Sequence, residues 1–117
     1  MLYSDQAWSA ASNANGEFMT IDAGHDIVVA AVATQGRADH HMQRVTSYDV
    51  LGSIDGIGFT VLASNLSGNS DQDTVVTHQL EALTRSRYVR FVPLTWNGHI
   101  SMRAAVLIMY LPPSLPP

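Results

Sequence analysis

Residues 87–103, RYVRFVPLTWNGHISMR, decide the expected fold of this chain. Residues 88–92 alternate from side to side with the period of two that is typical of a β-strand. Pro93 has no N–H for a strand ladder, so we expect it to end this strand or to place it at a sheet edge. Asn97-Gly98 is a turn dipeptide whose residues tolerate positive φ. The stretch therefore predicts a strand, a break and a second strand.

The rest of the chain repeats this pattern of short strands separated by turn residues. Asp55-Gly56 predicts a hairpin turn, and residues 81–86 predict a connection with a short helical turn. About seven or eight strands without sustained helical periodicity predict an all-β sandwich or barrel. The length of 117 residues suits one domain, expected over residues 1–111 with a Pro-rich tail at 112–117. Further strands are expected at 18–22, 26–35, 45–51, 59–62 and 74–80.

The composition excludes several classes of function. The net charge is −4 and all six cations are arginine, so we expect no nucleic-acid binding driven by general positive charge. The absence of cysteine excludes disulfides, thiolate metal sites and a cysteine nucleophile. The first residues lack the pattern of a signal peptide and the longest apolar run, 104–111, is too short to span a bilayer. We therefore expect no transmembrane segment, and the compartment stays open, with the cytoplasm favoured.

The order of features resembles the discoidin domain, also called the coagulation factor V/VIII type C domain. The segment 93–101, PLTWNGHIS, is especially similar to the slime-mould discoidin lectins. The residues that carry the resemblance are Ala7-Trp8, 18–24, 33–37, 45–48, 53–56, Phe59, 68–71, 74–76, 87–91, Pro93, Trp96 and 100–103.

The resemblance implies an eight-stranded antiparallel jelly-roll-like sandwich that binds a ligand and is not an enzyme. Ligands in the family are galactose-type sugars, anionic phospholipids, collagen or proteins, taken by loops at one end of the sandwich. Some features of the family are absent. Ala105 stands where a calcium-binding Glu is common, Ala104 stands at one position of a usual Cys pair, and little sequence precedes Trp8. These departures argue against a calcium site, so no cofactor is expected.

The loop at residues 37–44 is the main candidate for ligand binding, because it resembles a ligand-contacting loop of the family. Arg37 could hold vicinal hydroxyls or a carboxylate with two parallel hydrogen bonds. Asp39 could accept sugar hydroxyl protons, and His40 or His41 could donate or accept. Met42 could supply an adaptable apolar contact. The alternative is a solvated loop in which these side chains make only structural contacts.

Two further residues have both a ligand-binding and a structural interpretation. Trp8 could stack on the apolar face of a sugar, or it could fill the core. Asn69 lies in a turn-rich loop, where it could contact a ligand or cap the turn. His40-His41 is not expected to bind a metal, because adjacent residues of an extended segment point apart and no third ligand has suitable spacing.

Four residues are expected to be structural. Trp96, beside a turn, is expected to fill the core, with a ligand platform as the alternative. Asp22 lies in an otherwise apolar strand pattern, and a buried charge there needs a partner. Arg103 or Arg90 is the expected partner.

Two functional hypotheses follow. The first is a lectin-like module that binds a galactose-type sugar. The second is a structural subunit of an assembly or a homo-oligomer. It would bind its partner through the sheet edge that is uncovered if the family's first strand is missing, and through the apolar strand 104–111. The two are compatible, because small lectins often gain avidity by oligomerising.

Overall fold

The computed structural model describes residues 8–37 and 43–109. They form six strands and, within these ranges, no helix that could cross a membrane. The strands pair antiparallel in the order β1-β6-β2-β5-β3-β4. Their bounds are β1 Trp8–Ser9, β2 Met19–Gln35, β3 Arg44–Ser53, β4 Thr60–Ser67, β5 Val76–Asn97 and β6 Ser101–Ile108.

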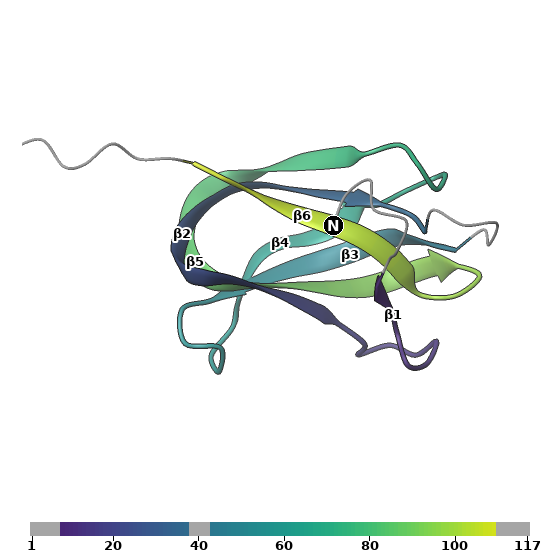
Figure 1. Ribbon diagram of the computed structural model, residues 1–117, viewed down its shortest axis with the longest axis horizontal. Coiled ribbons are helices and arrows are strands. Elements are labelled where there is room, and N and C mark those ends of the chain that lie inside the picture. The colour runs from purple at the N-terminus through teal and green to yellow at the C-terminus, as the bar shows by residue number, and fades with distance from the viewer. Residues whose placement is uncertain (1–7, 38–42, 110–117) are drawn as a thin grey trace, which may run out of the picture.

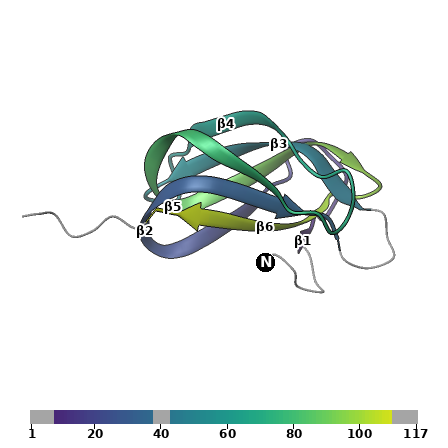
Figure 2. The same ribbon diagram turned by 90° about the horizontal axis from the view of Figure 1, so that it is seen from above.

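The two long strands, β2 and β5, bend together and fold this sheet into two layers (Figure 1). The register shifts between Asp22 and Ile27, so the start of β2 pairs with the later half of β5 and the rest of β2 pairs with its earlier half. One layer holds β6 with the adjoining halves of β2 and β5, and the other holds β3 and β4 with the remaining halves. Figure 2 shows the layers from above. The predicted all-β sandwich is confirmed, and β2 and β5 each contribute a strand to both layers.

The predicted connection with a helical turn at residues 81–86 is wrong, because β5 continues through it. Thr84, Arg85 and Ser86 pair with the segment of β2 from Ile27 to Val29. Partners distant in sequence thus impose a strand on a segment whose local pattern favours a break.

Pro93 does not end its strand. It lies within β5 opposite Tyr48, beside a register irregularity between Ser47 and Tyr48. Beyond Phe91, β5 has no pairing with β2 and is bonded only to β3. Because the register is irregular here and β5 has no hydrogen-bonded neighbour on its β2 side, a residue without an N–H can remain in the strand.

The core lies between the layers, and its buried strand residues come from β2, β3, β5 and β6, while partly buried side chains of β1 and β4 pack against them. Tyr48, Phe91, Ile100 and Met102 are its largest fully buried members. Each such apolar side chain contributes roughly 1.5–3 kcal/mol by leaving water. Burial also raises the pKa of the Tyr48 hydroxyl to about 12, because the charged form is disfavoured away from solvent.

Candidate ligand-binding end of the sandwich

Four segments meet at one end of the sandwich, on the right in Figure 1. We call this region the loop end. It consists of residues 10–16, the two ends of the β2–β3 loop at 36–37 and 43, residues 68–75 and residues 98–100. Hydrogen bonds join all four segments, so the loop end is a connected structure.

Arg37 and Gln43 close the base of the β2–β3 loop. The Arg37 backbone N–H donates to the Gln43 carbonyl at 3.0 Å, and Arg37 Nη1 donates to Gln43 Oε1 at 3.0 Å. Ser101 Oγ donates to the same Gln43 oxygen at 2.9 Å and lies 2.8 Å from Ser9 Oγ. Arg37 is thus fixed against the β6 and β1 strands. The other candidates of this loop, Asp39, His40, His41 and Met42, lie outside the described residues.

Arg103 links the β2–β3 loop to the β4–β5 loop. Its side chain is only 3% exposed. Nε donates to the Gly36 carbonyl and Nη2 to the Gln72 carbonyl, both at 2.7 Å, while Nη2 also lies 3.3 Å from Asp73 Oδ1. Buried carbonyls need donors, so this guanidinium holds two loops in a fixed relation. The structural role predicted for Arg103 fits this position, whereas its predicted pairing with Asp22 is wrong.

Asn69 is buried in the β4–β5 loop and its side chain points into the protein. It is 2% exposed, and Nδ2 donates to the carbonyls of Thr34 at 2.9 Å and Thr74 at 3.1 Å. Its backbone N–H donates to the Val45 carbonyl at 2.9 Å. This geometry fits the turn-capping alternative.

Asp71 caps the same loop from the solvent side. Its carboxylate accepts from the Thr74 hydroxyl and backbone N–H, both at 2.7 Å, and from the Asp73 N–H at 3.0 Å. These donors, above all the Thr74 hydroxyl, lower the pKa of Asp71, and the positive charge of Arg44 adds to the effect. The carboxylate thus stays charged at neutral pH.

The loop end also contains residues that the sequence did not single out. Asn13 Nδ2 donates to the Gly98 carbonyl at 3.0 Å, and its Oδ1 accepts from the Ile100 N–H at 2.8 Å. The ring nitrogen Nε2 of His99 lies 2.7 Å from the Ala10 carbonyl. No local motif identifies these contacts, because the partners come from opposite ends of the chain.

The two tryptophans flank the core beside the loop end. Trp8 pairs with Met102 across β1 and β6, and Trp96 pairs with Val45 across β5 and β3. Both are partly buried and pack against the core. Each tryptophan thus packs against the core on one side and keeps part of its surface open to solvent.

Asp22 and Arg90 do not pair, and this prediction is wrong. Asp22 instead accepts two hydrogen bonds from Arg87, at 2.9 and 3.1 Å, on an exposed surface. The Arg87 guanidinium and the Gly24 N–H lower the pKa of Asp22. Arg90 lies elsewhere on the sheet, between the rings of Phe18 and Phe59.

The described residues of the loop end form no metal centre. In residues 8–37 and 43–109, no three His, Asp or Glu side chains gather where they could hold an ion. A hollow of about 250 Å³ lies at the other end of the sandwich, lined by residues that include His25, Asp26, Arg85 and Met109. None of the predicted binding residues lines it.

Comparison with protein-family models gives a match over most of the chain. The F5/8 type C domain model matches residues 3–106. The chain belongs to the F5/8 type C family. The resemblance to this family that the sequence suggested is confirmed.

Relatives of this F5/8 type C chain include two kinds of protein. Rat (Rattus norvegicus) lactadherin is 36% identical over 107 residues, which cover 86% of this chain and 25% of lactadherin. A discoidin-1 of Dictyostelium discoideum is 33% identical over 100 residues, which cover 84% of this chain and 39% of the discoidin. The chain thus spans between a quarter and two fifths of these relatives.

Solved structures of the same fold agree with this assignment. Discoidin II of Dictyostelium discoideum is 25% identical with a TM-score of 0.82, over 91% of this chain and 42% of the discoidin. The family 32 carbohydrate-binding module of Clostridium perfringens NanJ, solved in complex with galactose, is 14% identical with a TM-score of 0.68, over 82% of this chain and 69% of the module. At that identity the module supports the fold alone.

Proposed function

We propose that this F5/8 type C domain is a non-catalytic carbohydrate-binding module that takes a galactose-type sugar at its loop end. The observation that carries this proposal is the network through Arg37, Gln43 and Ser101, which fixes a cationic side chain at the base of the β2–β3 loop. The partly exposed Trp8 lies on β1, the strand whose Ser9 extends this network. Polar groups held in place before binding lose little conformational freedom when a ligand arrives. The discoidins among its relatives are consistent with this function.

The residues of the loop end suit the chemistry of a sugar. A guanidinium can donate two parallel hydrogen bonds to neighbouring hydroxyl groups. The indole of Trp8 offers an apolar face that could pack against the C–H groups of a pyranose ring. In this proposal Asp39, His40, His41 and Met42 complete the contact, as predicted from the sequence.

Titration of the whole chain with galactose tests this function. Galactose is expected to raise the melting temperature, because a ligand that binds only the folded state stabilises it, by about 2.7 kcal/mol at a concentration of one hundred times Kd. Glucose, its epimer, is expected to have a smaller effect. Arg37→Lys, which keeps the charge but not the two-pronged donor, should weaken galactose binding, whereas Arg85→Lys at the opposite end should not. No binding on a broad glycan array, together with no change of the melting temperature in galactose, would refute the proposal.

A second candidate, a subunit that binds another protein chain, rests on the β6 strand. Residues 103–108 of β6 pair with β2 on one side only, since the described part of β1 bonds to Ser101 and Met102. Leu107, Ile108 and Met109 at its end are 41–56% exposed. An open strand edge with apolar side chains can pair with another chain.

The molecular mass in solution tests this second candidate. Sedimentation over a range of concentrations should show self-association or a stable complex with a partner. Leu107→Glu should abolish the association without unfolding the domain, because the side chain is exposed. A monomer at high concentration, unchanged by this substitution, would contradict self-association.

A further inference from the structure

The outer face of the β3–β4 layer carries an arginine held between two aromatic rings. Arg90 lies in the row of paired residues that runs from Thr20 on β2 through Arg90 on β5 to Leu51 on β3. Its Cζ lies 3.9 Å from the ring centre of Phe18 and 3.9 Å from that of Phe59. Phe18 comes from the β2 side and Phe59 from the β4 side, so the rings flank the guanidinium. We call these three residues the Arg90 clamp.

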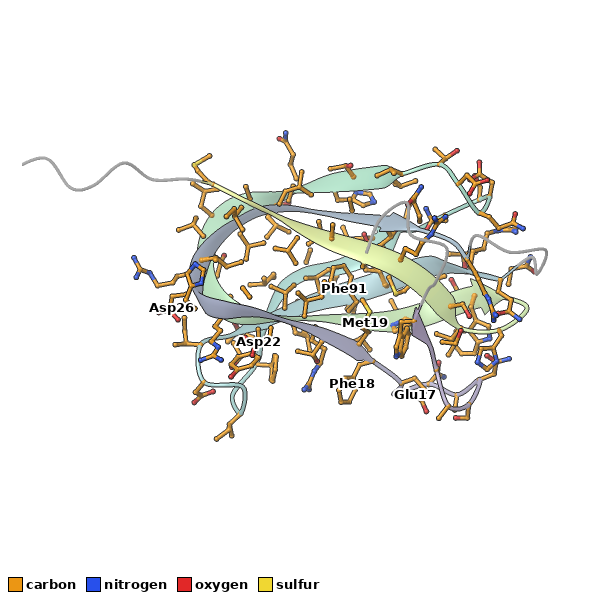
Figure 3. All side chains as sticks on the ribbon, in the orientation of Figure 1. Glu17, Phe18, Met19, Asp22, Asp26 and Phe91 are labelled. Atoms are coloured by element: carbon orange, nitrogen blue, oxygen red, sulfur yellow. The ribbon has the colours of Figure 1, made fainter. Side chains whose placement is uncertain are left out.

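The clamp is on the surface and not in the core. Phe18 is 47% exposed, whereas Phe91, its neighbour in the layer, is fully buried. Figure 3 shows Phe18 pointing away from the sandwich while Met19 and Phe91 lie between the layers. A ligand can therefore reach the clamp from solvent.

The guanidinium of Arg90 has donors left for a ligand. Nε donates to Thr20 Oγ1 at 3.1 Å, which fixes the plane of the group. Among the described residues, Arg90 makes no other hydrogen bond and no ion pair, and neither terminal nitrogen is buried. Asp22, an acid on the same face, already binds Arg87. In contrast, the buried Arg103 uses its nitrogens inside the protein.

We propose that the Arg90 clamp is a binding site for a carboxylate attached to a ring, as in a uronic acid or an aromatic acid. The two terminal nitrogens of a guanidinium match the two oxygens of a carboxylate with parallel hydrogen bonds. The phenyl rings cover both faces of the guanidinium, so less of its hydration is lost when the anion binds. The two rings leave a flat slot in the plane of the guanidinium. A planar carboxylate can lie in this plane, whereas a tetrahedral phosphate cannot.

The surroundings of the clamp suit the ring that carries the carboxylate. Val61 and Ile57 are 61% and 87% exposed, and both belong to the β3–β4 hairpin that also supplies Phe59. Val61 pairs with Leu51, which pairs with Arg90. Val61 and Phe18 therefore give apolar surface on the face that carries the slot. This site lies on the sheet and not at the loop end, so it goes beyond the proposed galactose site and can fail or succeed independently of it.

Benzoate and benzamide are the probes that test the clamp, because they differ only in the charged carboxylate. The whole chain, labelled with ¹⁵N, is titrated with each while the Nε–Hε signal of Arg90 is followed by NMR. Benzoate is expected to shift this signal to saturation, and benzamide is not. Followed through backbone amide signals, Arg90→Lys should weaken benzoate binding about tenfold, because the paired hydrogen bonds to a charged group are lost. Arg85→Lys, a matched exchange at an exposed arginine, should leave it unchanged.

Further probes define the ligand and the outcomes that would overturn the site. Glucuronate binding tighter than benzoate identifies a sugar acid, and the reverse identifies an aromatic acid. Equal shifts from benzoate and benzamide, or equal affinity for benzoate and methyl phosphate, would overturn the proposal, as would no shift with any carboxylate. These comparisons use the unaltered chain, so they decide the question even if Arg90→Lys fails to fold. Galactose binding is measured in parallel, and the conclusion about the Arg90 clamp is the same whether or not the chain binds galactose.

Discussion

The loop end adds partners from distant segments to its local caps, whereas the β3–β4 hairpin turn is capped by its own neighbours. At the loop end, Arg103 bonds to the carbonyl of Gly36, and Gln43 accepts from Ser101, so the partners lie far apart in sequence. In the hairpin turn, Asp55 accepts from the N–H groups of Ile57 and Gly58, its own neighbours. A turn that caps itself can change without disturbing its surroundings. A surface built from distant segments depends on the whole fold, and in return it holds side chains from several strands in one arrangement.

The largest expected effect comes from Arg103→Met, next to the loop end. This substitution removes the donors for two carbonyls inside the protein, and we expect the free energy of unfolding to fall by about 3 kcal/mol. Arg85→Met, at an exposed arginine without an ion pair in the described residues, should change it by less than about 0.5 kcal/mol. Urea unfolding measures both. Equal effects of the two substitutions would contradict the role of Arg103 as a link between loops.

Two glycines test how tightly each region is packed. A Cβ at Gly68 would lie 2.3 Å from the Val45 carbonyl oxygen, whereas a Cβ at Gly58 would meet nothing within 4 Å. Gly68→Ala should therefore destabilise the fold by about 2 kcal/mol or more, because the contact involves backbone that cannot move aside. Gly58→Ala in the hairpin turn should be neutral or slightly stabilising. Thermal unfolding of both variants checks this, and a harmless Gly68→Ala would show that the loop end is looser than described.

Asp71 and Asp55 give a pair of pH tests with a smaller effect. Hydrogen bonds lower both pKa values in the folded state, from Thr74 to Asp71 and from Ile57 and Gly58 to Asp55. Each carboxylate therefore adds stability that is present above its unfolded pKa, near 3.8, and is lost as the pH falls through the lower folded value. Asp71→Asn and Asp55→Asn should each flatten the acid side of the stability curve. Only Asp71→Asn should also weaken galactose binding. Equal galactose binding by both variants would show that Asp71 does not contribute to the galactose site.

The exposed pair of Asp22 and Arg87 should give the smallest effect. Solvent and salt screen such a pair, so Asp22→Asn and Arg87→Gln should each have a minor influence on stability that shrinks between about 0.01 and 1 M salt. The double variant should then resemble either single variant. A large coupling that persists in high salt would mean that the bend of β2 and β5 depends on this pair.

Local chemistry made part of the fold predictable. Asp55-Gly56 and Asn97-Gly98 form turns in which both glycines have positive φ, and such dipeptides carry this information by themselves. The continuous β5 strand was not predictable, because residues 81–86 are held extended by pairing with β2. The pairing of Asp22 was wrong for a similar reason. A charged residue in a strand pattern indicates that a partner is needed, while the bend of the strands decides that it is Arg87.

The candidate site could be located only in outline. Arg37 was identified through the resemblance to the family and Asn69 through its turn-rich loop, and the structure adds what each contacts. Gln43 and Ser101 lie in segments that resemble the family, yet no sequence pattern assigns them or Asn13 a role, because their contacts form when distant loops meet. The stacking of Arg90 between Phe18 and Phe59 likewise depends on strand order, which brings these three residues side by side.

The strand order also has a consequence for synthesis of the protein. β2 is made early, yet one of its two partners is β6, close to the end of the described chain. Until residues 101–108 leave the ribosome, β2 has an unpaired edge and Arg103 is not yet available to join the loops. Folding must then close contacts of long sequence separation, which is slow and leaves the nascent chain open to aggregation. We therefore expect a nascent chain stalled before residue 101 to be sensitive to protease and bound by chaperones, and release of the last strand to complete the domain.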